Sequence, residues 1–302
     1  MIRRESDDFE VVNCTICRSS SASEFTPGNY HLNVADPIKV VQCQNCGLYF
    51  LSPRPGAVAR TALLKGELPE SLRDYDSRTA NYAGVTQSRT QRFTTRLDRL
   101  SQLQPARKGS SQALLDVGAS AGTLVQLSRA RAFAGFGVEP SRDGTLAALA
   151  ESIQMPQAKA EALPYPADSF DIVHAHHVFE HLEDPFQAVK EAWRVLKPGG
   201  LIFIEVPNQF DNVMFKRDML FRRVPQRQRN IRSIHHFWFF SMQTLARLLT
   251  TAGFAQVHVQ APYSWQARGW RRPFSLLTRL VGRYSGGGDL LQGYGWKPAS
   301  GA

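Results

Sequence analysis

The chain has 302 residues, of which 43% are hydrophobic and 21% are charged. This length predicts one α/β domain of about 200 residues with an appendage. The composition excludes general disorder, a collagen-like repeat and a coiled coil. No apolar run approaches the roughly 18 residues that cross a bilayer, and the first eight residues carry no apolar stretch of the signal-peptide type. We therefore expect a cytoplasmic protein.

The net charge of +10 is unevenly distributed along the chain. From Phe215 onward there are 14 basic and 2 acidic residues, against 22 basic and 24 acidic residues before it. A strongly basic last third favours an anionic partner, such as a phosphate-bearing substrate, RNA or a membrane surface. The alternative is a solvated basic face that keeps the protein in solution.

All four cysteines lie near the N-terminus, as Cys14-x2-Cys17 and Cys43-x2-Cys46. Two C-x2-C turns together supply the four sulfurs of a tetrahedral zinc site. In a reducing cytosol, disulfides are the disfavoured use of these residues. With no open coordination position, the Zn²⁺ would be structural. The sequence therefore predicts a small zinc-ribbon-like module over residues 1–56.

Residues 57–108 are predicted to form a helical connector that covers a ligand site. Its apolar residues recur at helical spacing on one face: Phe93, Leu97, Leu100 and Leu103. Tyr75 and Tyr82 precede this helix and are candidates to cover the ligand.

From residue 109 onward, strand-like and helix-like segments alternate. The predicted strands are 113–117, 134–139, 170–175 and 201–206. The predicted helices are 123–132, one capped by Ser141, one capped by Asp184, and one capped by Ser241. This alternation predicts an α/β fold with a doubly wound, mainly parallel sheet over 109–302, interrupted by a basic insertion at about 212–236.

The first strand of this domain ends in a glycine-rich turn, and the second ends in Glu139. In such a sheet the two meet at the ligand site, where a carboxylate can accept both hydroxyls of a ribose. The turn is G-x-x-x-G, which lacks the pyrophosphate-binding pattern of dinucleotide domains. Asp116 lies just before it, and its charge repels a phosphate but attracts an ammonium group.

The segment 116–122 resembles the first motif of class I S-adenosylmethionine-dependent methyltransferases. Glu139, 161–173, 178–185 and 196–200 resemble later parts of that family, in the same order. The resemblance implies a Rossmann-like methyltransferase fold and S-adenosylmethionine as the methyl donor. It also implies the donor-binding residues: Asp116, Gly118, Ala119, Ser120, Gly122, Glu139, Ala160, Glu161 and His177.

The resemblance extends beyond the central domain. Residues 43–55 are similar to the zinc-binding leader of a methyltransferase subgroup that often acts on sugars, glycans or natural products. Residues 235–241 and the following helix, which ends at 253–254, also resemble that subgroup, and 288–291 match its last strand.

Two positions depart from the family pattern. Ser120 replaces the middle glycine of the first motif, which is tolerable if its backbone angles are ordinary. Lys159 stands where an adenine-contacting aspartate is common, so the adenine contact moves to the Ala160 backbone and Glu161.

The sulfonium methyl of the donor is already activated, so the protein must align an acceptor and, for a hydroxyl, remove its proton. Histidine suits that task near neutral pH. The candidate bases are His181, His235 and His236. Each can instead be a structural hydrogen-bonding residue. Asn208 is a further candidate contact to the acceptor, whereas the aromatic run 237–240 is interpreted as core.

These features predict a methyltransferase that O-methylates a sugar, glycan precursor or small metabolite. The absence of an Asn/Asp-Pro-Pro-Tyr motif argues against amino methylation of bases. The alternatives are an RNA methyltransferase that holds RNA with the zinc module and the basic last third, and a catalytically inactive scaffold of the same fold. A peripheral membrane contact of the basic segments also stays open.

Overall fold

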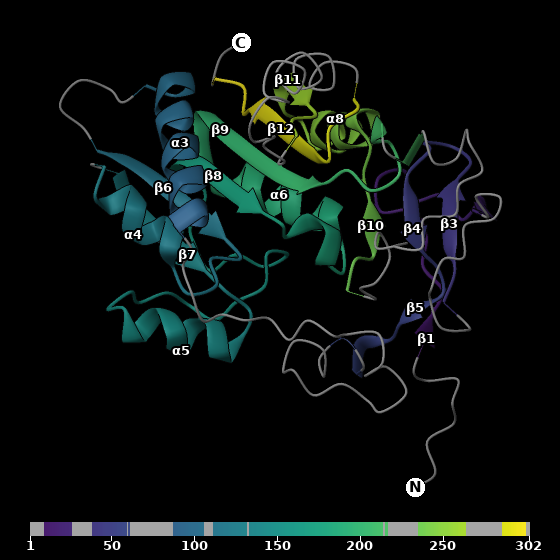
Figure 1. Ribbon diagram of the computed structural model, residues 1–302, viewed down its shortest axis with the longest axis horizontal. Helices are drawn as coiled ribbons and strands as arrows, with labels where there is room; N and C mark the ends of the chain where they lie inside the picture. The colour runs from purple at the N-terminus through teal and green to yellow at the C-terminus, as the bar shows by residue number, and fades with distance from the viewer. Residues whose placement is uncertain are drawn as a thin grey trace, which may run out of the picture.

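A six-stranded sheet forms the centre of the protein in the computed structural model (Figure 1). The structure describes residues 9–25, 38–58, 60, 87–105, 111–131, 133–213, 215–216, 235–263 and 286–299. The strand order is β11-β12-β9-β8-β6-β7. The strands are β6 (Gln112–Val117), β7 (Phe133–Val138), β8 (Phe170–His176), β9 (Leu196–Pro207), β11 (Ala255–Gln260) and β12 (Leu290–Trp296).

The four strands from β7 to β9 run parallel, and β12 pairs antiparallel with both β9 and β11. Helices lie between the parallel strands, so the predicted doubly wound α/β fold is confirmed. The strands β6, β7 and β8 match their predicted bounds to within one residue.

The start of β9 differs from the prediction. The strand was predicted to begin at residue 201, but pairing already begins at Leu196, opposite Phe170. The register then shifts before Leu201 pairs with Ile172. Hydrogen bonds from the Gly199 amide to the Lys297 carbonyl, and from the Lys297 amide to Gly200, hold the extra residues at the sheet.

The last two strands were only partly predicted. β12 extends over Leu290–Trp296, beyond the expected 288–291, and β11 was not predicted. β11 is an edge strand with mostly exposed side chains and an irregular register. It therefore lacks the apolar alternation that indicates a strand.

Five described helices flank the sheet: α3 (Gln87–Leu103), α4 (Thr123–Arg129), α5 (Arg142–Ala150), α6 (Pro185–Val195) and α8 (Met242–Thr251). The predicted caps are confirmed, because the side chains of Ser141, Asp184 and Ser241 each accept a hydrogen bond from an amide of the first helical turn. α4 ends at Arg129, three residues before its predicted end.

Helix α3 forms most of the described part of the predicted 57–108 connector. Phe93, Leu97 and Leu100 are buried, and they pack in one cluster with Leu114 and Phe203 of the sheet. The helix thus lies directly on the central sheet. Tyr75, Tyr82 and most of the basic insertion lie outside the described residues.

The N-terminal module contains the strands β1 (Phe9–Glu10), β2 (Ala22–Glu24), β3 (Val40–Cys43), β4 (Tyr49–Leu51) and β5 (Arg54–Pro55). Its four-stranded sheet has the order β10-β4-β3-β2, and β10 (Trp238–Phe239) comes from the far end of the chain. Figure 1 shows β10 between β4 and the central domain. The module is therefore completed by residues outside the predicted 1–56.

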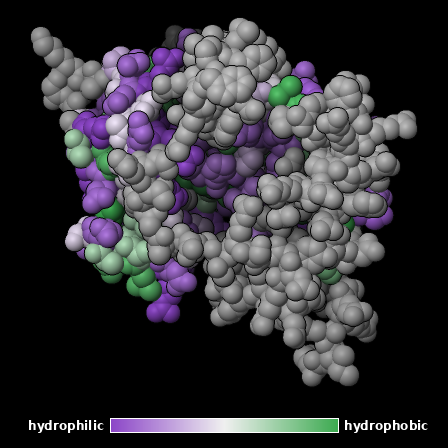
Figure 2. Space-filling model, in the orientation of Figure 1, coloured by the Kyte–Doolittle hydropathy of each residue, from purple (hydrophilic) through white to green (hydrophobic). Residues whose placement is uncertain are grey.

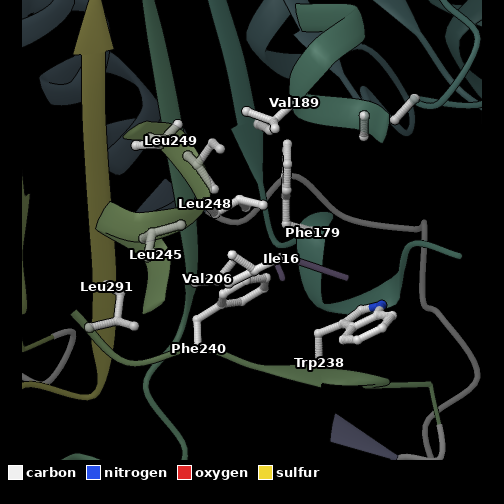
Figure 3. Close-up of a cluster of buried hydrophobic side chains, with 14 of the residues drawn as sticks. Ile16, Phe179, Val189, Val206, Trp238, Phe240, Leu245, Leu248, Leu249 and Leu291 are labelled. Atoms are coloured by element: carbon white, nitrogen blue, oxygen red, sulfur yellow. The ribbon is translucent and has the colours of Figure 1, made fainter. Parts of the chain in front are cut away.

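One hydrophobic core joins the module to the central domain. Figure 3 shows Ile16 of the first cysteine turn among Phe179, Val206 and Phe240, with Trp238 beside them. Trp238 is 2% exposed, and its indole N–H donates to the Leu182 carbonyl at 2.7 Å. The prediction that the aromatic run 237–240 is core is confirmed, since all four side chains are buried.

Candidate active site

The glycine-rich turn after β6 adopts left-handed backbone angles. Gly118 and Gly122 have φ of +70° and +77°. The amides of Gly118 and Ala119 both donate to the Val138 carbonyl, at 2.9 and 3.0 Å. The turn is thereby tied to the end of the neighbouring strand β7, where the sequence placed the ligand.

Ser120 does not meet the condition stated for it. Its φ is +52°, in the left-handed region that favours glycine, so its backbone angles are not ordinary. Its amide donates to Glu139 Oε2 at 2.9 Å, and this bond holds the residue in place. The turn therefore keeps the shape of the glycine motif at a cost in backbone strain.

Glu139 links the turn to the next helix. Its Oε1 accepts from the Ser141 amide at 2.9 Å, while Oε2 accepts from Ser120. The residue is 7% exposed, and burial raises the pKa of its carboxyl group despite these two bonds. Each oxygen still has a lone pair for a further donor, such as a ribose hydroxyl.

Asp116 is held by a buried histidine that the sequence analysis did not identify. His174 Nδ1 lies 2.7 Å from Asp116 Oδ1, and His174 Nε2 lies 3.3 Å from a terminal nitrogen of Arg96. An arginine only donates, so Nε2 accepts, and a neutral His174 must carry its proton on Nδ1 and donate it to Asp116. Arg96 thus favours the tautomer in which His174 donates a hydrogen bond to the Asp116 carboxylate.

The same arginine contacts a second buried acid. Its other terminal nitrogen lies 2.6 Å from Glu205 Oε1, and Glu205 is 2% exposed. His176 Nδ1 also lies 2.8 Å from Glu205. Burial raises the pKa of Glu205, but the nearby His176 and Arg96 outweigh it, so the pKa is lowered overall. The one signal for this network in the sequence is polar residues within otherwise apolar strands.

The two residues expected near adenine lie in the segment between α5 and β8, and Glu161 contacts the loop before α6. Glu161 Oε1 accepts from the Glu183 amide at 2.9 Å and the Asp184 amide at 3.3 Å, and Ala160 is buried. Lys159 pairs with Glu183 at 2.8 Å. Glu161 therefore anchors this loop, and its predicted adenine contact stays a prediction.

His177 and Glu180 form a pair after β8. His177 has a φ of +54°, and its Nδ1 lies 3.0 Å from Glu180 Oε1. Burial lowers the pKa of His177, but the hydrogen bond and the charge of Glu180 outweigh this effect. The pKa of His177 is therefore raised overall. The predicted donor contact of His177 stays a prediction.

Two of the three candidate bases meet at Glu180. The rings of His181 and His236 are 4.7 Å apart in an edge-to-face arrangement, and one ligand atom each of Glu180, His181 and His236 lies within 4.8 Å of the others. His181 Nδ1 lies 2.8 Å from the carbonyl oxygen of His235, and His236 Nδ1 lies 3.1 Å from Gln209 Oε1. Both oxygens only accept, so each Nδ1 carries the proton and each Nε2 keeps its lone pair.

His181 combines a desolvated ring with access to solvent. Desolvation by the surrounding protein lowers the pKa of the His181 ring, yet the side chain is 39% exposed. Figure 2 shows hydrophilic side chains in a recessed area in the middle of the face seen there. The third candidate base, His235, contributes its backbone carbonyl to this cluster.

Asn208 was expected to contact the acceptor, and the structure gives it another role. It is 2% exposed, and its side-chain nitrogen donates to the carbonyls of Gly286 and Gly288 at 2.8 and 2.7 Å. A residue enclosed in this way braces the end of β9 and does not line an open site.

The four cysteines come together as predicted. Cys14 Sγ lies 3.4 Å from Cys46 Sγ, Cys17 Sγ lies 3.5 Å from Cys43 Sγ, and all four sulfurs lie within 4.8 Å of one another. Sulfurs bound tetrahedrally to zinc at 2.3 Å would be about 3.8 Å apart. The four thiols are free, so their geometry fits a zinc ion without a disulfide.

A family model described as a methyltransferase domain matches residues 87–259. The chain belongs to this methyltransferase family. The match covers more than half of the chain and includes the glycine turn, Glu139 and the histidine cluster.

Curated relatives of the methyltransferase match shorter segments. The chain is 34% identical over 129 residues to 27-O-demethylrifamycin SV methyltransferase of Amycolatopsis mediterranei, and the match covers 38% of this chain and 47% of that protein. It is 43% identical over 54 residues to the ubiquinone/menaquinone biosynthesis C-methyltransferase UbiE of Hahella chejuensis, covering 18% and 22%. The matched region thus spans less than half the length of these relatives.

Solved structures with a similar fold include a methyltransferase of Thermotoga maritima, titled a possible histamine N-methyltransferase. Its superposition on this chain has a TM-score of 0.47 and a sequence identity of 20%, and it covers 69% of this chain and 91% of the Thermotoga chain. The YcgJ protein of Bacillus subtilis gives a TM-score of 0.46 at 19% identity, covering 68% and 98%.

The observed strand ends suit the donor that this family implies. Asp116 and Glu139 place two acids beside the turn, which favours a ligand with ammonium and sulfonium charges over a phosphate. A Cβ on Gly118 or Gly122 would meet Val178 or Ile153 at less than 3.0 Å, so these two glycines let the turn pack closely on its neighbours. The residues of the methyltransferase therefore fit S-adenosylmethionine. Among the described residues, no helix is long and apolar enough to cross a membrane.

Proposed function

We propose that the methyltransferase moves a methyl group from S-adenosylmethionine to a hydroxyl of a sugar, a glycan precursor or another small metabolite. The observation that carries this proposal is the fixed tautomer of His181, whose Nε2 lone pair lies beside a buried carboxylate after β8. The names of the two relatives refer to oxygen in one and carbon in the other, so the choice of oxygen rests on this geometry.

The bound donor supplies a methyl group on a positively charged sulfur. Asp116 and Glu139 would hold this donor, and transfer of its methyl group to the acceptor oxygen would leave the electron pair of the carbon–sulfur bond on sulfur. The hydroxyl proton passes to His181 Nε2. Glu180 lies 3.9 Å from that nitrogen and stabilises the imidazolium that forms. Because surrounding atoms lower the pKa of His181, the ring is neutral and ready to accept a proton at pH 7.

The substitution His181→Asn tests the base. The asparagine amide can replace the Nδ1 donor to the His235 carbonyl while removing the Nε2 lone pair. We expect the methyl-transfer rate to fall by roughly 10²–10⁴-fold, with donor affinity unchanged in a calorimetric titration. An unchanged rate would exclude His181 as the base.

The acceptor class is tested with methyl-labelled S-adenosylmethionine and a cell lysate separated into RNA, glycan-lipid and small-molecule fractions. We expect label in the glycan or small-molecule fractions. Label in RNA that disappears on nuclease treatment would replace this proposal by the RNA alternative. Much of the basic last third lies outside the described residues, so its contact with substrate, RNA or membrane stays a prediction.

We further propose that Cys14, Cys17, Cys43 and Cys46 hold a structural Zn²⁺. The support is the convergence of four free thiols, two of which are buried, at separations close to those of a tetrahedral site. Thiolate ligation of this kind fits a reducing compartment, so we propose the cytoplasm as the location. Elemental analysis of the purified protein tests the metal, and a zinc-free sample of folded protein would exclude it.

A further inference from the structure

A second group of potential metal ligands lies away from the cysteines, at Glu180, His181 and His236. We propose that these three residues bind a divalent first-row transition-metal ion such as Zn²⁺ or Co²⁺, and that this ion and the acceptor proton compete for His181. The second half of this statement rests on the proposed function, because it takes His181 as the base.

The hydrogen bonds around the two histidines are those of metal ligands. A ligating histidine usually donates its second ring N–H to a carbonyl or carboxylate, which fixes the ring and leaves the other nitrogen for the metal. His181 does this to the His235 carbonyl at 2.8 Å, and His236 does it to Gln209 Oε1 at 3.1 Å. Both Nε2 atoms are then available.

Glu180 supplies an independent observation. It is 1% exposed, its Oε1 is bonded to His177, and its Oε2 has no hydrogen-bond partner. A buried carboxylate oxygen without a partner is costly and rare in folded proteins. A metal ion bound by the two neighbouring histidines would satisfy it.

The three groups together present acceptors without a donor. One ligand atom of each lies within 4.8 Å of the other two. Two imidazoles and one carboxylate suit zinc, iron, cobalt or manganese, and they leave positions open for water.

A neighbouring group shows why this cluster is the better site. His176, His177 and Glu205 also lie within 4.8 Å of one another. There, however, Arg96 lies 2.6 Å from Glu205 and already supplies a positive charge. Among the described residues, no lysine or arginine forms an ion pair with Glu180, whose charged neighbours are histidines, so a second cation is more strongly disfavoured beside Glu205 than beside Glu180.

Metal binding has a consequence for catalysis. The nitrogen that would take the acceptor proton is the one that would ligate the metal, and a lone pair cannot do both. We therefore expect the metal-bound enzyme to transfer methyl groups at least 10-fold more slowly, with the loss reduced at high acceptor concentration.

The test begins with the full chain carrying zinc at its four cysteines and titrates it with Co²⁺. We expect one additional equivalent of cobalt with weak visible bands and without the near-ultraviolet charge-transfer band of thiolate ligands. Glu180→Gln and His236→Gln should each weaken this binding by at least 10-fold. His258→Gln, which alters an exposed histidine on β11, should not.

Retained zinc in the variants shows that they are folded. No cobalt beyond the cysteine site in the wild type, or unchanged cobalt binding in Glu180→Gln, would overturn the metal site. Cobalt binding that leaves methyl transfer unchanged or faster would overturn the competition. Should no hydroxyl acceptor be found, the proposed function fails, while the cobalt titration still decides the metal site.

Discussion

Arg96 of α3 donates to the ring of His174 in β8, and this contact places the proton of a neutral His174 on the nitrogen that faces Asp116. A helix that packs on the sheet thereby favours a hydrogen bond to an acid at the predicted donor site. The guanidinium also compensates Glu205, a carboxylate that is almost fully buried. One side chain serves both the stability of the fold and the geometry of the site.

Replacing Arg96 with methionine should be strongly destabilising. The change keeps much of the apolar stem but leaves Glu205 buried without its positive partner, which typically costs about 3–5 kcal/mol. Urea unfolding measures this loss. Arg99→Met on the same helix is the control, since Arg99 is exposed. A difference between the two variants of less than about 1 kcal/mol would contradict the role given to Arg96.

The local features of the fold could be predicted from the sequence, because neighbouring residues determine them. Ser141, Asp184 and Ser241 each cap a helix through their own first turn, and each was predicted. β11 was missed because an exposed edge strand has no apolar face to give a period. Local sequence patterns thus located the helices and strands that have one buried face.

The long-range contacts could not be predicted in this way. β10 pairs with β4 across most of the chain, and nothing near Trp238 indicates that partner. His181 and His236 were both candidates, yet their meeting at Glu180 depends on how two distant loops pack. Arg96 lies among the other arginines of α3, and its burial follows only from the sheet beneath it.

The strain at Ser120 gives a second prediction. A non-glycine residue in the left-handed region costs about 1–2 kcal/mol, and the cost is greatest for β-branched side chains. We expect Ser120→Gly to retain the free energy of unfolding or raise it by up to about 1 kcal/mol, because glycine also loses more entropy on folding. Ser120→Val should lower it by more than about 1 kcal/mol. Chemical unfolding of both variants checks the order, and equal stability would contradict a strained backbone.

The pH profile of methyl transfer should follow the protonation of His181. Surrounding atoms lower the pKa of this ring, so the neutral base persists to lower pH than in a free histidine. We expect kcat/KM to rise with pH through a midpoint below about 6.5 and to be level at pH 7. His181→Asn should remove this rise. A midpoint above pH 7 in the wild type would contradict the desolvated environment.

The lowered pKa of His236 predicts that the folded protein loses stability in acid. Its pKa is lowered to about 3 by burial and by the neighbouring His181, so the unfolded chain binds its proton more readily than the folded one. Stability is then fully present above about pH 6.5 and is lost as the pH falls toward 3. We expect about 1–2 kcal/mol less stability at pH 5 than at pH 7 from this group. His236→Gln should flatten the dependence by that amount, and an identical pH profile in the variant would rule out this contribution.

Removing the metal from the four cysteines should destabilise the whole chain. The second turn precedes β4, which pairs with β10, and Ile16 of the first turn shares a core with Trp238 and Phe240. A structural zinc ion contributes directly to folding, so a loss of about 3 kcal/mol would lower the Tm by roughly 5 °C at this chain length. Calorimetry with and without a chelator measures the shift, and Cys43→Ser should reproduce it without chelator. Because the core is continuous, we expect one shifted transition. A separate early transition, with the main one unmoved, would mean that the module unfolds independently of the methyltransferase domain.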